Sequence, residues 1–222
     1  MANPEHVNIV RQGRDAIAEW RQQNPEARLD LAGANLSGAQ LFEADLTRAD
    51  LSGADLILAN LTVAKLTEAN LSDANLSDAN LYLASLTRAD IRRANLTEAN
   101  LTWAELTEAD LTGAYLVDTN LIAADFTAAD LTGVYLEGAS LAGCDLGQAI
   151  GLATINHKGP SSIGVDTLIA SFRGAGNKLT PDLETFFLGA GVPRELLAAL
   201  PGIVGAVEYY SCFISYGQPD LG

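Results

Sequence analysis

The chain has 222 residues, of which 48% are hydrophobic, and its 28 acidic and 13 basic residues give a formal net charge of −15. Charge this negative disfavours binding to nucleic acid or to anionic lipid. Two Cys cannot build a disulfide framework, and two His leave little for metal or acid–base chemistry, so we assign no catalytic, cofactor or metal residues and expect no enzyme. Without a signal-peptide pattern or a membrane-spanning apolar run, a cytoplasmic location is the default expectation.

The first 27 residues predict a helical cap. Asn3 and Pro4 are typical of an N-cap and a first helical residue, and Asn24 with Pro25 is typical of a helix end. We expect one helix over residues 4–23, interrupted near Gly13, that covers the element following it.

A five-residue repeat fills residues 28–150. An apolar residue recurs at every fifth position from Leu31 to Leu146, giving 24 centres of which 22 are Leu, and Ala lies two residues before 20 of them. This period matches neither a helix nor a continuous strand. We predict that the centre and the Ala point inward, that the residue between them points outward, and that the two residues after the centre form a corner.

The number of faces in one coil follows from sorting equivalent positions. When the centres are assigned to four faces in turn, five of the nine Asp residues that precede a centre share one face, as do five of the ten Thr residues that follow one. Sorting into three faces spreads both evenly. The pattern therefore predicts a four-faced coil of 20 residues and about six coils, stacked about 4.8 Å apart.

Runs such as Ala-Asn-Leu-Ser-Asp at 74–78 and Ala-Asp-Leu-Thr-Gly at 109–113 closely resemble the pentapeptide-repeat proteins. The resemblance implies a bacterial protein and an all-β solenoid: a right-handed quadrilateral parallel β-helix. With it we expect the N-terminal capping helix and a small helical C-terminal segment. Members of this family differ widely in role, so the resemblance does not imply one function.

One outward column forms an acidic ridge, interrupted by Asn70. Its function could be mimicry of a phosphate backbone or cation binding. The simpler interpretation, which we favour, is that Asp and Asn bond locally to a turning backbone. The ridge consists of Asp30, Asp50, Asp90, Asp110 and Asp130.

Large apolar residues gather at the outward positions of another face, beside a column of Asn. Such a stripe exceeds scattered surface hydrophobes, so something should cover it. The candidates are a protein partner, a second copy of the chain, or the chain's own C-terminal segment. The stripe consists of Phe42, Val63, Tyr82, Leu83, Trp103 and Ile122.

Residues 151–208 predict a linker followed by short helices. The linker spans 152–161, and helices are expected at 165–172, at 181–188 with Thr180 as N-cap, and at 193–200, ended by Pro201. We expect these helices to pack on the last coil or on the apolar stripe.

The last segment, 209–222, reads as an apolar strand at 209–216 followed by a Gly-Gln-Pro-Asp turn. The strand resembles the first strand of a Toll/interleukin-1 receptor (TIR) domain, and the preceding segment resembles the connector found before such domains. The rest of that fold, including the catalytic Glu of its NAD-cleaving members, does not follow. We therefore expect a truncated TIR-like end and assign no TIR activity.

Three functions remain open. The leading one is a non-catalytic scaffold, or protein-interaction module, whose rigid acidic rod binds a protein partner or a second copy and neither nucleic acid nor membrane. The second is a DNA-mimicking inhibitor of a type II topoisomerase, favoured by six basic against 18 acidic residues within 28–150. The third is the N-terminal part of a TIR-domain NAD hydrolase or signalling protein, which requires a longer natural chain.

Overall fold

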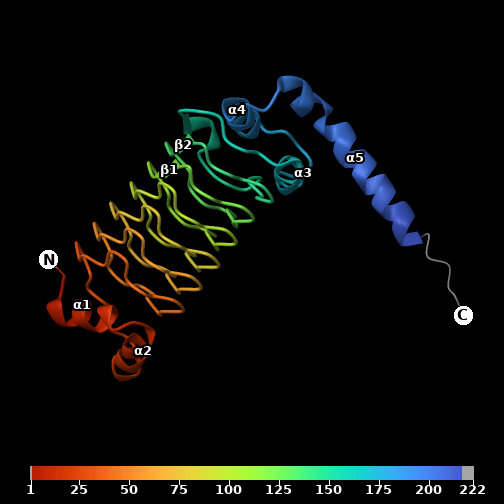
Figure 1. The fold of residues 1–222 in the computed structure, drawn as a ribbon. Helices are drawn as coiled ribbons and strands as arrows, with labels where there is room; N and C mark the ends of the chain where they lie inside the picture. Colours follow the sequence, from red (N-terminus) through yellow and green to blue (C-terminus); the bar gives the residue numbers. More distant parts are fainter. Residues whose placement is uncertain (1, 217–222) are drawn as a thin grey trace, which may run out of the picture.

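The computed structural model describes residues 2–216, and the side chains of residues 2–206. A stack of coils forms the body, with two helices at one end and the remaining helices at the other (Figure 1). The elements are α1 (Pro4–Arg11), α2 (Arg14–Gln23), β1 (Tyr115–Val117), β2 (Tyr135–Glu137), the 3-10 helix η1 (Leu152–Thr154), β3 (Asn156–His157), α3 (Val165–Gly174), α4 (Pro181–Gly189) and α5 (Arg194–Tyr216).

Parallel pairing between residues 20 apart holds the coils together. Asp30 pairs with Asp50, and the pairs repeat at every fifth residue, so four columns of pairs run along the stack. The Leu31 amide donates to the Asp50 carbonyl at 2.8 Å, and the Asp50 amide donates to the Leu29 carbonyl at 2.8 Å. Most pairs are isolated bridges; β1, β2 and β3 are the named strands of the described chain and form one parallel sheet. The spacing agrees with the predicted four-faced coil.

The interior contains the residues that the repeat places there. Leu86 and Leu106 are at most 1% exposed, and the Ala residues two positions before the centres are buried as well. The two residues after each centre form a turn, and the second of them has a positive φ, as at Glu68 (58°). Ala is required at the inward position beside Leu because a narrow coil has no room for a second large side chain.

Asp and Asn stabilise the corners by bonding to the backbone. The Asp50 Oδ1 accepts the Ser52 amide at 3.2 Å, and the Asn100 Oδ1 accepts the Thr102 amide at 3.1 Å. The same bond recurs in most coils, which explains why these two residues precede so many of the centres. The local interpretation of the acidic ridge is therefore sufficient to account for its composition.

Two helices cover the first coil where the sequence predicts one interrupted helix. The break falls at Gly13, whose φ is 91°. The first coil has no preceding coil to occupy its carbonyls, and arginines occupy them instead: Arg11 donates to the Asn35 carbonyl at 2.9 Å and Arg21 to the Thr47 carbonyl at 2.7 Å. These donors satisfy an edge that would otherwise be open to another chain.

Residues 151–162 are not the linker that the sequence predicts. They extend the coil: β3 pairs in parallel with β2, joining Tyr135 to Asn156, and Ser140 pairs with Ser162. The spacing grows from 20 to 21 and then 22 residues because η1 inserts a turn. Irregular spacing hides this segment from a search for period five, yet the last regular coil needs a partner for its backbone groups.

Side chains of α3 complete the other end of the stack. The Cys144 amide donates to the Thr167 Oγ1 at 3.3 Å, and the Leu146 amide donates to the Ser171 Oγ at 3.0 Å. Thr167 and Ser171 are both fully buried. The hydroxyls therefore satisfy amides that would otherwise be left without a partner.

The final helix departs furthest from the sequence prediction. As expected, α4 begins after Thr180, whose Oγ1 accepts the Leu183 amide at 3.3 Å. In contrast, Pro201 does not end the next helix but lies inside α5. The strand expected at 209–216 is wrong as well, because α5 continues to Tyr216. The expected turn at 217–220 lies outside the described residues.

Cooperativity and pairing explain both errors. A helix adds one hydrogen bond for each residue that it gains, so a helix already formed tends to continue. A strand needs a paired neighbour, and the described chain places none beside 209–216. No helix among residues 2–216 combines the length and apolarity needed to cross a bilayer.

Candidate interaction surfaces

The apolar stripe lies along one corner of the coil stack. Its residues are the first or second residue after a centre, and the second residues are held with positive φ: 59° at Val63, 56° at Leu83 and 59° at Trp103. The exposed fractions of the six are 44% (Phe42), 38% (Val63), 38% (Tyr82), 45% (Leu83), 56% (Trp103) and 38% (Ile122). The corner geometry thus places the whole stripe on the surface.

The chain's own C-terminal segment does not cover the stripe. Helices α3 and α4 pack on the end of the stack, where α4 contacts η1 and α3 bonds to the last coil. Figure 1 shows α5 leading away from that end. The expectation that residues 162–208 shield the stripe is wrong, because the last coil has unpaired backbone groups that the helices satisfy first.

A flat polar face borders the stripe. It carries the Asn column, in which the Asn100 side-chain amide donates to the Asn80 Oδ1 at 3.2 Å. Across this face lies the preceding corner, which carries the exposed carboxylates Asp78, Glu98 and Asp118. An apolar edge and an acidic edge therefore bound the same face.

The acidic ridge on another face is largely compensated by arginine. Arg28 contacts Asp50 at 2.8 Å, and Arg92 contacts Asp90 at 2.5 Å and Asp110 at 3.6 Å. The hydrogen bond from Arg92 lowers the pKa of the Asp90 carboxyl, so this group stays ionised. Five positions that look alike in sequence thus differ in their charge balance.

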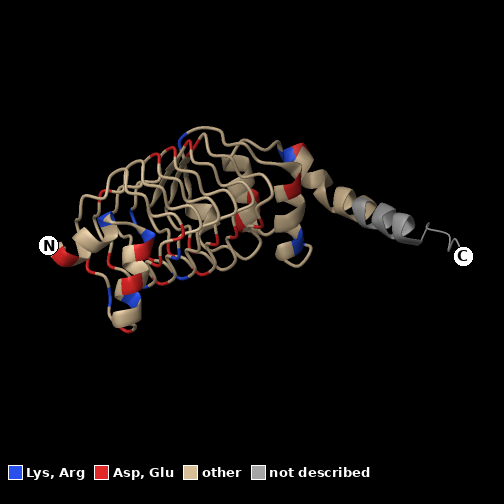
Figure 2. Ribbon diagram, turned by 60° about the horizontal axis from the view of Figure 1, so that its bottom comes forward, with Lys and Arg blue, Asp and Glu red and all other residues tan. Residues whose placement is uncertain are grey.

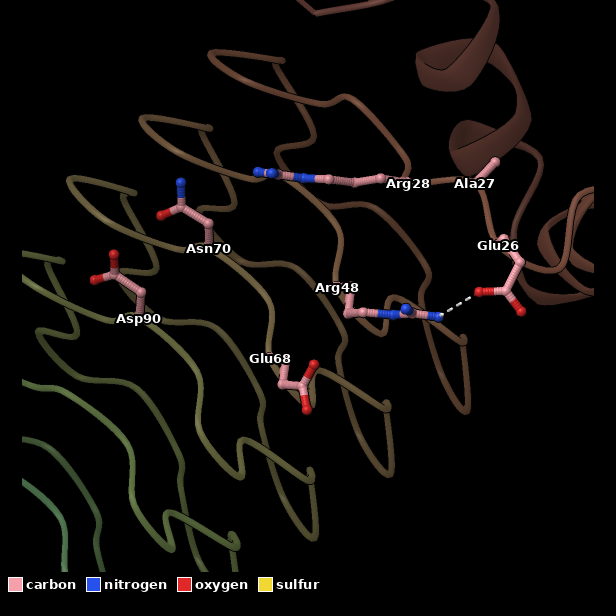
Figure 3. Close-up of a pocket in the computed structure, with 7 residues that line it drawn as sticks. All are labelled: Glu26, Ala27, Arg28, Arg48, Glu68, Asn70 and Asp90. Carbon is pink, nitrogen blue, oxygen red and sulfur yellow. Dashed lines mark ion pairs between the residues drawn. The ribbon is translucent and has the colours of Figure 1, made fainter.

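An open hollow of about 490 Å³ lies where the ridge meets the N-terminal cap (Figure 3). Arg48 reaches from its corner toward Glu26, at 3.9 Å, and Arg28 extends over the face toward Asn70. Figure 2 shows basic and acidic positions side by side over α2 and the first coils. Charges of both signs neutralise each other here, and the hollow offers no concentrated charge to a ligand.

Titratable groups with catalytic potential are few in the described chain. Burial raises the pKa of the Cys144 thiol to about 12, so this thiol remains protonated and unreactive. Among residues 2–216, no three His, Cys, Asp or Glu side chains are grouped to hold a metal ion.

Sequence reasoning missed the groups that close the two ends. Arg11, Arg21, Thr167 and Ser171 satisfy the edges of the stack, and His157 packs 5.4 Å from the Phe186 ring with neither ring nitrogen bonded. A signal existed for α3 alone: Thr167 and Ser171 are four residues apart and share one helix face. For the others, the partner lies at least 23 residues away, and no local pattern reveals it.

Comparison with known proteins agrees with the repeat geometry. The family model described as pentapeptide repeats matches residues 27–62 and, in overlapping segments, 64–150. No curated protein matches the chain.

Solved structures of three repeat proteins are similar to the chain. HetL, a pentapeptide repeat protein involved in heterocyst differentiation regulation from the cyanobacterium Nostoc sp. strain PCC 7120, is 34% identical, with 61% of this chain and 72% of that chain covered and a TM-score of 0.28. Rfr23 from the cyanobacterium Cyanothece 51142 is 26% identical, with coverage of 55% and 88% and a TM-score of 0.42. QnrB1, a plasmid-mediated fluoroquinolone resistance protein, is 17% identical, with coverage of 67% and 94% and a TM-score of 0.37.

The family match covers more than half of the chain and coincides with the coils that pair at a spacing of 20 residues. Members of this family form a right-handed quadrilateral β-helix, and four columns of parallel pairs are what such a helix contains. The chain belongs to the pentapeptide-repeat family.

Proposed function

We propose that the protein is a non-catalytic scaffold whose apolar stripe binds a protein partner. The observation that carries this proposal is the alignment of six large apolar side chains on one exposed corner. Aromatic residues with aliphatic neighbours are typical of the centres of protein interfaces. Isolated surface hydrophobes would need no explanation, but a continuous row does.

The backbone at the stripe gives independent support. Val63 is β-branched and is nevertheless held at a φ of 59°, a region that such residues rarely adopt. Gly occupies the same corner position in other coils, as at Gly53 and Gly113. Folding alone therefore does not require a bulky residue at this corner, and strained positions often accompany function.

The DNA-mimicry alternative has weaker support. The acidic balance of residues 28–150 favours it, yet arginines contact Asp50, Asp90 and Asp110 of the ridge. A mimic of DNA needs regularly spaced, uncompensated charge. Inhibition of gyrase supercoiling by the purified protein, weakened by Asp50→Ala, Asp110→Ala and Asp130→Ala together, would favour this alternative over the scaffold.

The TIR alternative depends on a chain longer than this one. Its motif was expected to form a strand, and α5 occupies those positions. Nothing in the described residues favours NAD cleavage over the scaffold.

A capture experiment tests the scaffold. The stripe variant combines Tyr82→Ser, Leu83→Ser and Trp103→Ser, and a control variant combines Tyr115→Ser, Ile150→Ser and Val165→Ser, which are exposed at 44%, 54% and 55% away from the stripe. We expect the wild type and the control to retain the same partners, or the same self-association in light scattering, and the stripe variant to lose them. Identical behaviour of all three proteins would overturn the proposal.

A further inference from the structure

The acidic edge beside the stripe is distinct from the acidic ridge. Asp78, Glu98 and Asp118 occupy the same corner of three consecutive coils, because each lies 20 residues from the next. In the part of the chain that the structure describes, no ion pair involves any of them. Negative charge therefore remains uncompensated along this edge.

The arginines of the coil stack lie on other corners. Arg48 and Arg88 share one corner, and Arg92 and Arg93 lie on the next, where they contact Asp90 and Asp73. On the far side of the stripe, Lys65 is accompanied by the acidic residues Asp45, Glu105 and Asp125. Acidic groups thus predominate on both sides of the apolar row.

This charge distribution disfavours a second copy as the occupant of the stripe. Two copies packed through the same surface would bring their acidic edges together, and each chain carries a net charge of −15. A partner that brings positive charge gains attraction at the same place.

We propose that the stripe and the acidic edge together form a docking surface for a basic amphipathic helix of a partner protein. This inference rests on the proposed scaffold function and names the chemistry of the partner. Apolar side chains of the helix cover Tyr82, Leu83 and Trp103. Its Lys or Arg side chains cross the Asn face to Glu98 and Asp118.

Spacing selects a helix over a strand. Neighbouring coils are about 4.8 Å apart, so three consecutive acidic groups span about 9.6 Å. A helix presents one residue on a given face about every 5.4 Å, or about 10.8 Å over two turns. The difference of about 1 Å is within the reach of a flexible Lys or Arg side chain. Alternate residues of a strand would span about 13 Å, a mismatch of more than 3 Å.

A designed peptide tests the chemistry directly. The probe is an amphipathic helical peptide of Leu and Lys, about 14 residues or four turns long, and its control has Ser in place of every Leu. In calorimetric titrations, we expect the Leu peptide to bind at least about tenfold more tightly than the Ser peptide. The stripe variant should lose this preference, because the apolar contacts are gone.

Charge-matched variants test the acidic edge. One combines Asp78→Asn, Glu98→Gln and Asp118→Asn; its control combines Glu19→Gln, Glu108→Gln and Glu195→Gln, which change the net charge equally but lie away from the face. We expect the first to weaken binding of the Leu peptide about fivefold or more and to reduce its salt dependence, and the control to change it less than about twofold.

Two outcomes would overturn the inference. Equal weakening by both charge variants, or no preference for Leu over Ser, would mean that bulk charge alone attracts the peptide. A concentration-dependent dimer that the stripe variant abolishes would assign the surface to a second copy, and the scaffold function would stand without the basic helix. Failure of the scaffold function itself is distinguished by the capture experiment, in which the stripe variant would then match the wild type.

Discussion

Each residue of the five-residue repeat meets a different physical demand. The centre fills the axis of the coil, the preceding Asp or Asn bonds to the corner, and the second residue after the centre adopts a positive φ. Substitutions at neighbouring positions should therefore differ sharply in their cost.

We expect Leu106→Asp to unfold the coils and Asp110→Asn to have little effect. Leu106 is fully buried, so the new carboxylate would have no water and no partner, at a cost above about 4 kcal/mol. Asn at position 110 can still accept the Thr112 amide, which lies 2.9 Å from Asp110 Oδ1. Thermal unfolding of the two variants checks this, and similar losses would contradict the inward and outward assignment.

Val63→Gly should stabilise the protein. Valine at positive φ costs about 1–2 kcal/mol, which glycine avoids, although glycine loses more backbone entropy on folding. The net expectation is a gain of up to about 1 kcal/mol in urea unfolding. The matched control Val165→Gly, at the start of α3 where φ is not positive, should lower stability; a loss at Val63 as well would show that the corner imposes no strain.

At the level of elements, the two ends of the stack are closed by opposite chemistry. Arginines of α1 and α2 donate to free carbonyls, and hydroxyls of α3 accept from free amides. Helices at either end therefore act through individual hydrogen bonds as well as through apolar cover.

We expect Thr167→Val to cost about 1–3 kcal/mol, although the side chain keeps its shape. The Cys144 amide would be left buried without an acceptor. Denaturant unfolding and amide exchange at Cys144 measure the effect. Thr185→Val on α4, where the exposed hydroxyl bonds only within its own helix, serves as the control and should change stability by less than about 0.5 kcal/mol.

The contact between β3 and α4 should weaken in acid. Burial lowers the pKa of His157 below its ordinary value of 6.5, so the unfolded chain binds a proton more readily than the folded one. Stability should then fall as pH decreases from 7.5 through 6.5 toward 5.5. His157→Leu, at a position that pairs with Leu136, should remove this part of the pH dependence of the melting temperature. An unchanged pH dependence would exclude His157 as its source.

For the whole molecule, the four faces are chemically similar inside and different outside. Every face presents Leu and Ala to the axis, while ion pairs, Asn residues or apolar residues distinguish the outer surfaces. The core therefore tolerates rotation of one part against another, and the surfaces do not.

Deleting residues 96–100, one complete repeat, should leave the fold intact. All later residues would move back by one face, so Trp103 and Ile122 would no longer align with Tyr82 and Leu83. We expect a circular dichroism spectrum like that of the wild type and loss of the preference for the Leu peptide. An unfolded product would show that the faces are not interchangeable, and retained preference would show that continuity of the stripe is unnecessary.

The sequence by itself determined the coil, its inward and outward positions and the members of the stripe, because each depends on a period that repeats many times along the chain. Tertiary structure decided the rest. The extra pairing of residues 151–162, the Arg and hydroxyl bonds at the two ends, and the exposure of the stripe all depend on contacts between distant segments. The same is true of α5: its apolar residues suit either a strand or a helix, and the absence of a pairing neighbour among residues 2–216 leaves the helix as the structure that satisfies its backbone.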